Sequence, residues 1–481
     1  MAVMASVLLL PLVVGPAAGA ATPPDPALGW LRQHAQELVG DLQADGHFMR
    51  AADEGRPANY ITPRAADLAT LAHGGADVVG PDEASALVAD TLSLLRQQQP
   101  AEPPEELPAR AWLLAGAATA SWLNSTTLCS ELPPLWGQLQ RNYADPAAWQ
   151  GGLSFSASPR IAGIETVASS GHDTFLSLLH YRALDALAAA AERAKCGDAA
   201  PMRTAQHAIS AALSDGSQPL WDDEVGMFRP SSGINANRTD VWGSALAVDT
   251  GAVTGERAAR IVAWFGQHWS SVVQDGQIRH LPAIGDESGM PAGQYWPNTT
   301  TWQFGTYANG GYWGEASGWV LPVIGRANHE LGQRLVRDAI AAAQRDGGLS
   351  EWQNTKFCCN CEGAAAWTGL CMTPYPSTAS LRGASRYGRS VFNIYSAAKR
   401  LLGPAATAKP PRTVALPAEP EPAAPLTLHA QATAAMAAKQ LAPGVDPDVA
   451  WLTEYATMYQ AQARECTVRA ILLERSLPLL R

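Results

Sequence analysis

The segment Tyr295–Trp319, YWPNTTTWQFGTYANGGYWGEASGW, carries the most information about fold and function. Aromatic residues, glycines and side-chain amides surround one carboxylate, Glu315, and an apolar helix is expected over Tyr312–Ile324. Trp and Tyr present a flat apolar face and a polar edge, which suit the C–H face and the hydroxyls of a sugar ring. The segment therefore indicates a carbohydrate site, although Gly310 and Gly311 would also relieve crowding where the chain enters a helix.

The N-terminus predicts a secretory signal peptide over residues 1–20. Val7–Val14 forms a short apolar core, and Ala18-Gly19-Ala20 supplies the small residues that precede cleavage. No later stretch reaches the run of about 20 apolar residues that a membrane span requires. We therefore expect the chain to be secreted or to reside in the lumen of the secretory pathway.

Sequons and cysteines fit such a compartment. Acceptor triplets for N-glycosylation begin at Asn124, Asn237 and Asn298. Four of the seven cysteines cluster without a histidine among them, and their spacing does not give two separated Cys-x-x-Cys pairs, so one or two disulfides are expected in place of zinc. The clustered cysteines are Cys358, Cys359, Cys361 and Cys371. Which cysteines pair is left open.

Charge and composition exclude some classes of partner. The formal net charge is −10 and the chain has no basic run, which argues against nucleic acid and anionic membranes as partners. Sixteen tryptophans is a high count for 481 residues. Many are expected in the core, but several lie beside glycine and proline in predicted loops, where core packing explains them less well.

The spacing of apolar residues predicts an all-α body of helical hairpins. The predicted helices are Leu28–Leu42, Ala84–Leu95, Ala109–Leu123, Phe175–Ala194, Ala205–Leu213, Val241–Thr250, Ala258–Val273, Gly318–Ile324, Glu330–Gln344 and Val391–Leu402. Short connections with glycine and aromatic residues recur between them, which indicates a closed or stacked helical array. The connections are Trp149–Phe155, Leu220–Phe228, Gly276–Pro282 and Gly347–Trp352.

The chain divides by composition into four parts. The predicted signal peptide, 1–20, is followed by the helical domain, 21–402. Residues 403–425 are rich in Pro and Ala and predict an extended linker. Residues 426–481 have helical composition but are too short to bury a core of their own, so we expect a tail that is partly helical or disordered.

Four motifs occur in order along the chain: Leu220-Trp-Asp-Asp-Glu-Val-Gly-Met-Phe, Asp240-Val-Trp-Gly-Ser-Ala-Leu-Ala-Val, Gln277-Ile-Arg-His-Leu-Pro and Asn309-Gly-Gly-Tyr-Trp-Gly-Glu-Ala-Ser-Gly-Trp. Together they resemble the six-hairpin glycosidase superfamily. The resemblance covers Leu28–Leu402. It implies an (α/α)6 toroid, in which six helical hairpins form an inner and an outer ring, with short loops or small β-hairpins at the mouth of a funnel that holds the active site. The superfamily also contains lyases, phosphorylases, epimerases and chains without known activity.

The resemblance further implies an inverting glycoside hydrolase, which uses two carboxyl groups about 6.5–9.5 Å apart. Glu315 is the candidate general base, and complementing a helix dipole is its ordinary alternative role. Asp240 is the candidate general acid, and Asp173 is a third candidate. Both precede an apolar helix, so each is equally suited to be an N-cap.

The remaining candidates are groups that would bind substrate. His172 lies beside Asp173 as a hydrogen-bonding or proton-handling partner, and Arg279 with His280 suits hydroxyls or a sugar carboxylate. A surface salt bridge and a packed histidine are the alternatives for that pair. The expected stacking wall and its polar partner comprise Trp242, Trp296, Trp302, Tyr312, Trp313 and Asn309, of which at least half are also suited to the core.

The sequence therefore predicts a glycoside hydrolase that acts on an oligo- or polysaccharide with no organic cofactor and no metal. Asp222-Asp-Glu224 offers oxygen ligands for calcium, but its spacing matches no standard loop. A catalytically silent carbohydrate-binding toroid is the first alternative. A polysaccharide lyase, with a Tyr or His base in place of two carboxylates, is the second.

Overall fold

We describe a computed structural model of the chain. The described residues are 25–44, 65–80, 84–86, 88, 89, 92, 106–161, 167–215, 219–282, 310–349, 352–353, 357–358, 373–374 and 388–403. Within these ranges, every helix is too short or too polar to traverse a bilayer. The predicted signal peptide, the tail and all of the linker except Gly403 lie outside the described residues.

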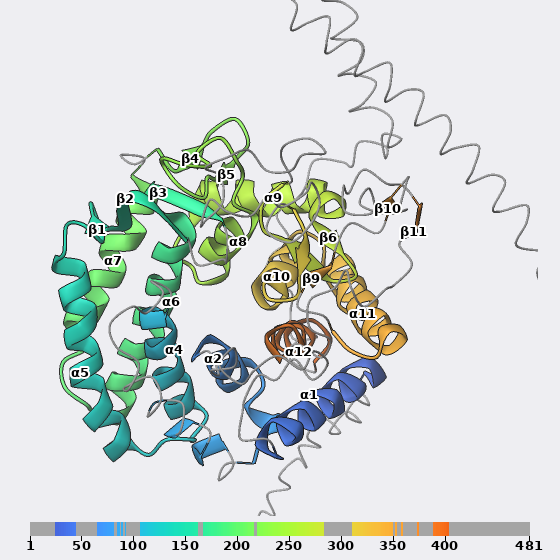
Figure 1. Ribbon diagram of the computed structural model, residues 1–481, viewed down its shortest axis with the longest axis horizontal. Helices are drawn as coiled ribbons and strands as arrows, with labels where there is room; N and C mark the ends of the chain where they lie inside the picture. Colours follow the sequence, from blue (N-terminus) through green and yellow to red (C-terminus); the bar gives the residue numbers. More distant parts are fainter. Residues whose placement is uncertain are drawn as a thin grey trace, which may run out of the picture.

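Six helices form a closed inner ring (Figure 1). Each contacts the next in chain order, and the last returns to the first. They are α2 (Ala65–Gly74), α4 (Glu106–Thr119), α6 (Thr174–Ala194), α8 (Val241–Asp249), α10 (Ser317–Ala327) and α12 (Gly388–Leu402). Every residue of Val241–Val248 in α8 is buried, as expected for a helix that is enclosed on all sides.

Five described helices lie outside this ring. α5 packs between α4 and α6, α9 between α8 and α10, and α11 between α10 and α12, while α7 packs on α6 and α1 on α12. Their bounds are α1 (Pro26–Ala44), α5 (Ser125–Ala144), α7 (Ala200–Ser214), α9 (Gly255–Val272) and α11 (His329–Asp346). The inner and outer rings confirm the predicted all-α class and the (α/α)6 toroid.

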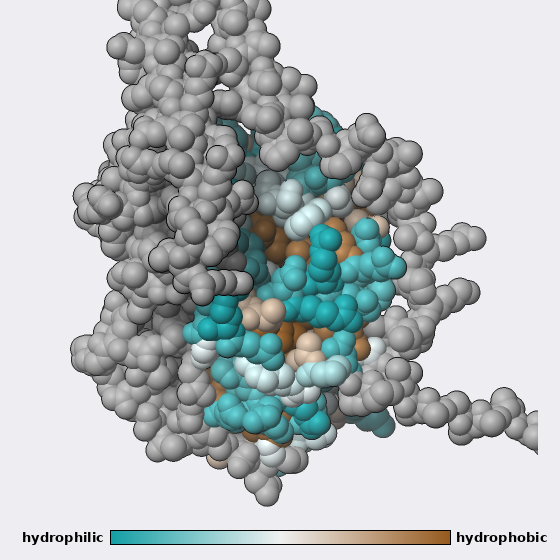
Figure 2. Space-filling model, turned by 90° about the vertical axis from the view of Figure 1, so that its right-hand side faces the viewer, coloured by the Kyte–Doolittle hydropathy of each residue, from teal (hydrophilic) through white to brown (hydrophobic). Residues whose placement is uncertain are grey.

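The outer helices are amphipathic, because one face packs on the inner ring. In α11 the buried positions include Leu331, Leu335 and Ala339, which recur every four residues along one face. Figure 2 shows the side where α1 and α11 lie, and its described surface is mainly hydrophilic, with apolar residues visible between the polar ones.

Short strands occupy the connections that run from an outer helix to the next inner helix. They are β1 (Trp149–Gln150), β2 (Leu153–Ile161), β3 (Ala168–His172), β4 (Trp221–Asp222), β5 (Met227–Phe228), β6 (Val273–Gln274), β7 (Gln277–Arg279), β8 (Tyr312–Trp313), β9 (Trp352–Gln353), β10 (Phe357–Cys358) and β11 (Thr373–Pro374). All pairings are antiparallel. β6–β9 form one sheet, in which strands from the α9–α10 connection pair with a strand from the α11–α12 connection. The strands therefore lie at the N-terminal ends of the inner helices, where the funnel mouth is expected.

The opposite connections, from inner to outer helix, are short. α6 ends at a left-handed Lys195, and α7 begins five residues later at Ala200. A single residue, Asn328, separates α10 from α11, and its side chain accepts a hydrogen bond from the Leu331 amide to cap α11. These tight turns close the far end of the ring, so the longer and more variable connections gather at the mouth.

Two helices were not predicted from the sequence. α2 is only ten residues long, and α5 contains Pro133 and Pro134, which remove two backbone donors and usually end a helix. α5 nevertheless continues, because Leu128, Leu132, Leu135 and Leu139 are buried along one face. Tertiary packing thus overrides the local signal.

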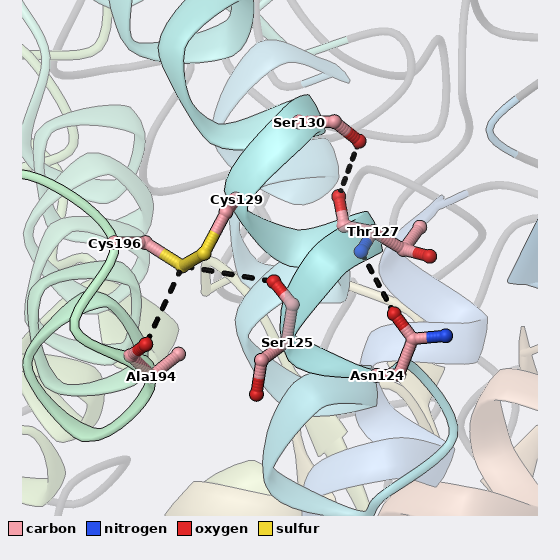
Figure 3. Close-up of a disulfide and its surroundings, with 7 residues drawn as sticks. All are labelled: Asn124, Ser125, Thr127, Cys129, Ser130, Ala194 and Cys196. Atoms are coloured by element: carbon pink, nitrogen blue, oxygen red, sulfur yellow. Dashed lines mark hydrogen bonds between the residues drawn. A yellow bond between two sulfur atoms is a disulfide. The ribbon is translucent and has the colours of Figure 1, made fainter.

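A disulfide joins Cys129 of α5 to Cys196, which follows α6 (Figure 3). It bridges 67 residues of sequence and links an outer helix to the next hairpin. The disulfides expected within the cluster Cys358–Cys371 fall mostly outside the described residues. Figure 3 also shows Asn124, the first residue of a predicted sequon, as the N-cap of α5.

Candidate functional site

The candidate acids lie at the N-terminal ends of three inner helices. Asp173 is the N-cap of α6, Asp240 is the N-cap of α8, and Glu315 precedes the first residue of α10 by two positions. The three inner helices run side by side in the ring. The structure therefore brings the three candidates to the same end of the toroid.

Asp173 is fully buried in the wall of the ring. Its Oδ1 accepts a hydrogen bond from the Leu176 amide at 2.8 Å, and its Oδ2 accepts one from the Ser169 hydroxyl at 2.6 Å. Burial raises the pKa of the Asp173 carboxyl to about 6, and the nearby Asp240 charge acts in the same direction. Asp173 is therefore both a helix cap and an acid that holds its proton in mildly acidic solution.

Asp240 is also fully buried. Its Oδ1 accepts a hydrogen bond from the Gly243 amide at 2.7 Å, while its Oδ2 has no hydrogen-bond partner within the described part of the chain. His280 Nε2 lies 3.2 Å from Asp240 Oδ1, in a geometry too poor for a directed hydrogen bond. Burial lowers the pKa of His280, so this ring is neutral. It is a packed histidine, which was the alternative to a substrate-binding role.

Glu315 differs from the two aspartates because 17% of its side chain remains exposed. Its Oε1 is 2.5 Å from Arg389 Nη1, at the start of α12. The Arg389 guanidinium is itself 8% exposed, so the ion pair is largely enclosed. This contact fixes the position of the Glu315 carboxylate beside α12.

The described aromatic candidates lie in the core. Trp242 is fully buried, Trp313 is 4% exposed and Tyr312 is 5% exposed. Trp242 donates Nε1–H to the Ile278 carbonyl, and its own carbonyl accepts Nε1–H from Trp319. These contacts join β7, α8 and α10 behind the mouth, so these rings support the wall from within. Trp296, Trp302 and Asn309 lie outside the described residues.

Arg279 and His172 keep part of their surface exposed. The Arg279 guanidinium donates to the Gly310 carbonyl and to the Tyr312 hydroxyl, and it lies 4.6 Å from the centre of the Tyr312 ring. The His172 ring packs against Phe155, and burial lowers the pKa of His172. Both residues belong to strands, β7 and β3, and they are held by the strand pairing at the mouth.

Asp222 has a structural partner that accounts for its charge. It accepts hydrogen bonds from the Glu224 and Val225 amides and pairs with Arg229 at 3.2 Å. Across the described ranges, no group of three His, Cys, Asp or Glu side chains is arranged to hold a metal ion.

Sequence reasoning missed the charged residues inside the ring. Arg182 of α6 lies 3.5 Å from the centre of the Trp112 ring of α4, and Asp249 of α8 pairs with Arg400 of α12. Arg182 interrupts the apolar stretch Phe175–Ala191, and that interruption was the available signal. The signal was weak because one arginine in a long helix usually marks an exposed position.

No protein-family model and no curated protein matches the sequence. Solved structures of glycoside hydrolases resemble the chain.

Three of these structures differ in identity, TM-score and coverage. A GH78 rhamnosidase of Bacillus sp. GL1 is 12% identical with a TM-score of 0.45, and the match covers 78% of this chain and 35% of that one. The GH63 mannosylglycerate hydrolase of Thermus thermophilus, in complex with glucose, is 16% identical with a TM-score of 0.46, covering 76% and 99%. A possible GH105 member from Salmonella enterica is 10% identical with a TM-score of 0.42, covering 82% and 98%.

This chain thus spans about a third of the rhamnosidase. The toroid is established by the closed contacts of the inner ring.

Proposed function

We propose that this chain is a glycoside hydrolase that binds an oligo- or polysaccharide at the N-terminal end of the inner ring. The observation that carries the proposal is the position of Glu315. Of the three described candidate acids, it alone keeps exposed surface, and its carboxylate is positioned by Arg389. The motifs that resemble the six-hairpin glycosidases support the same assignment.

In this proposal Glu315 activates water and an aspartate protonates the leaving oxygen. The raised pKa of Asp173 suits the acid, because the group carries a proton near pH 6. Asp240 remains the other candidate. Since neither aspartate has exposed surface, the wall around one of them must open when substrate binds.

A carbohydrate-binding toroid without turnover is the second candidate. It is favoured by the complete burial of Asp173 and Asp240 and by their hydrogen bonds to helix amides. Both interactions are those of ordinary N-caps. In that case the funnel would bind glycans through the mouth residues alone.

Incubation with a panel of glycans, with product anomers followed by NMR, tests the proposal. Turnover with inversion that is abolished by Glu315→Gln, and retained by the exposed control Glu330→Gln, would support hydrolysis. Asp173→Asn and Asp240→Asn identify the acid. Binding without turnover in the parent protein would support the second candidate, and neither binding nor turnover across the panel would contradict both.

We also propose that the chain passes through an oxidising secretory compartment. The Cys129–Cys196 disulfide and the exposed side chains of Asn124 and Asn237 support this. Glycosidase-sensitive mass on the protein from its natural source tests it, and unmodified asparagines with free thiols would contradict it.

A further inference from the structure

Arg182 occupies the centre of the inner ring. It lies on α6 and contacts Trp112 of α4 at 3.5 Å and Trp319 of α10 at 5.7 Å. Its charge also acts on His73 of α2, Asp249 of α8 and, on α12, Arg389. Arg182 therefore interacts with residues of all the other inner helices. Its side chain must point into the ring, because a helix in a closed ring otherwise contacts only its two neighbours.

The Arg182 guanidinium has no hydrogen-bonding partner in the described part of the chain. Its Nε is buried and unbonded, and its recorded contacts are with the two indole rings. Cation–π contacts satisfy the flat face of a guanidinium but leave the N–H groups at its edge free. Arg182 also keeps part of its surface exposed, so this edge faces accessible space inside the ring.

The two carboxylates near Arg182 are already paired with other arginines. Asp249 accepts hydrogen bonds from Arg400 at 2.5 and 3.2 Å and lies 3.7 Å from Arg326. Glu315 is paired with Arg389, as described above. Arg182 is therefore a surplus cation, in a chain whose formal net charge is −10.

Holding this cation costs folding free energy. Burial lowers the pKa of Arg182 to about 9, well below its ordinary value. A cation–π contact offsets only part of the cost of enclosing a charge that has no hydrogen-bonded partner. An arginine held in this way suits a ligand that supplies the missing negative charge.

We propose that Arg182 binds the carboxylate of a sugar acid, so that the ring takes an acidic glycan. A guanidinium edge matches a carboxylate with two parallel hydrogen bonds. The Trp112 ring, which stacks on His73 and lies under the guanidinium, holds the cation in place beside the sugar acid. The inference rests on the proposed function only in taking the ligand to be a carbohydrate.

Calorimetric titration with matched sugar pairs tests this inference without requiring turnover. The pairs are glucose with glucuronate and galactose with galacturonate, because the members differ only at C6; acetate is the simple anion. We expect the uronates to bind about tenfold or more tightly than their neutral partners, and Arg182→Met to abolish that preference. Arg203→Met on the outer helix α7, where Arg203 pairs with Asp185, is the matched control that should keep it.

Thermal unfolding separates a binding role from a structural one. If Arg182 is held for a ligand, Arg182→Met removes an unpaired charge and should leave the melting temperature unchanged or raised. Equal binding of neutral and acidic sugars, no binding of any uronate, acetate binding as tight as uronate binding, or a preference that survives Arg182→Met would each overturn the inference. Turnover of neutral glycans without a uronate preference would overturn it while leaving the proposed hydrolase intact.

Discussion

Arg400 of α12 donates its Nη1–H to the Gly318 carbonyl of α10 at 3.1 Å. This carbonyl would ordinarily accept from the amide four residues later, but that residue is Pro322, which has no N–H. Arg400 also forms the two hydrogen bonds to Asp249 of α8. One side chain therefore repairs a helix and joins three inner helices.

Arg400→Met should lower the free energy of unfolding by about 1–3 kcal/mol, because a backbone carbonyl and a carboxylate both lose their donor. The cost should be smaller in a Pro322→Ala background, where the restored amide serves the Gly318 carbonyl. Urea denaturation of the four proteins of this double-mutant cycle measures the difference. Arg345→Met, which removes an exposed ion pair, is the control, and identical costs in both backgrounds would contradict the assignment.

Gly243→Ala should destabilise the protein by about 1–3 kcal/mol, because a Cβ at this position overlaps the Asp240 side chain. In an Asp240→Ala background the same change should be neutral or stabilising, since alanine favours a helix by about 1 kcal/mol over glycine. Thermal denaturation measures both. Gly137→Ala in α5, where only the tip of Arg141 is near, should stabilise in either background.

Removing the Cys129–Cys196 disulfide should cost about 4 kcal/mol, as expected for a closed loop of this length. The double variant Cys129→Ser with Cys196→Ser avoids leaving a free thiol. Its melting temperature should fall below that of the oxidised parent and match that of the reduced parent. If the melting temperature of the parent protein is the same with and without reductant, the result would argue against this pairing.

His180 should make the protein sensitive to acid. Burial lowers its pKa to about 3, and the Tyr143 hydroxyl lies 3.0 Å from Nδ1. Below the ordinary histidine pKa of about 6.5, His180 is protonated in the unfolded chain but stays neutral in the folded chain. The free energy of unfolding therefore falls by up to about 1.4 kcal/mol per pH unit as the pH drops. His180→Gln should flatten this loss between pH 6.5 and 4.5 in urea titrations.

Asp173 acts in the opposite direction, because its folded pKa of about 6 is raised above the ordinary value. Acidification from pH 6 to 4 protonates the folded chain first and therefore adds stability. Asp173→Asn should make the free energy of unfolding fall more steeply with decreasing pH, whereas His180→Gln should make it fall less steeply. His207→Gln, at an exposed position, is the control for both variants. Parallel slopes in all variants would contradict both assignments.

Part of the site was predictable because caps are local. An acid before an apolar helix meets the free amides of its own first turn, so the positions of Asp173 and Asp240 follow from a few neighbouring residues. Their burial does not follow, since it depends on strands that fold over them. The same reason explains Trp242, which was expected to face ligand and lies in the core.

The sequence by itself determined most of the described helices, the caps and the end of the toroid at which the acids gather, because each depends on spacing within one or two turns. The tertiary structure decided which cysteines pair, which tryptophans are enclosed, and that Arg182 is left without a carboxylate. Those outcomes depend on closure of the ring, which brings residues far apart in sequence into contact at its centre. Local sequence patterns do not indicate which residues far apart in the chain come into contact.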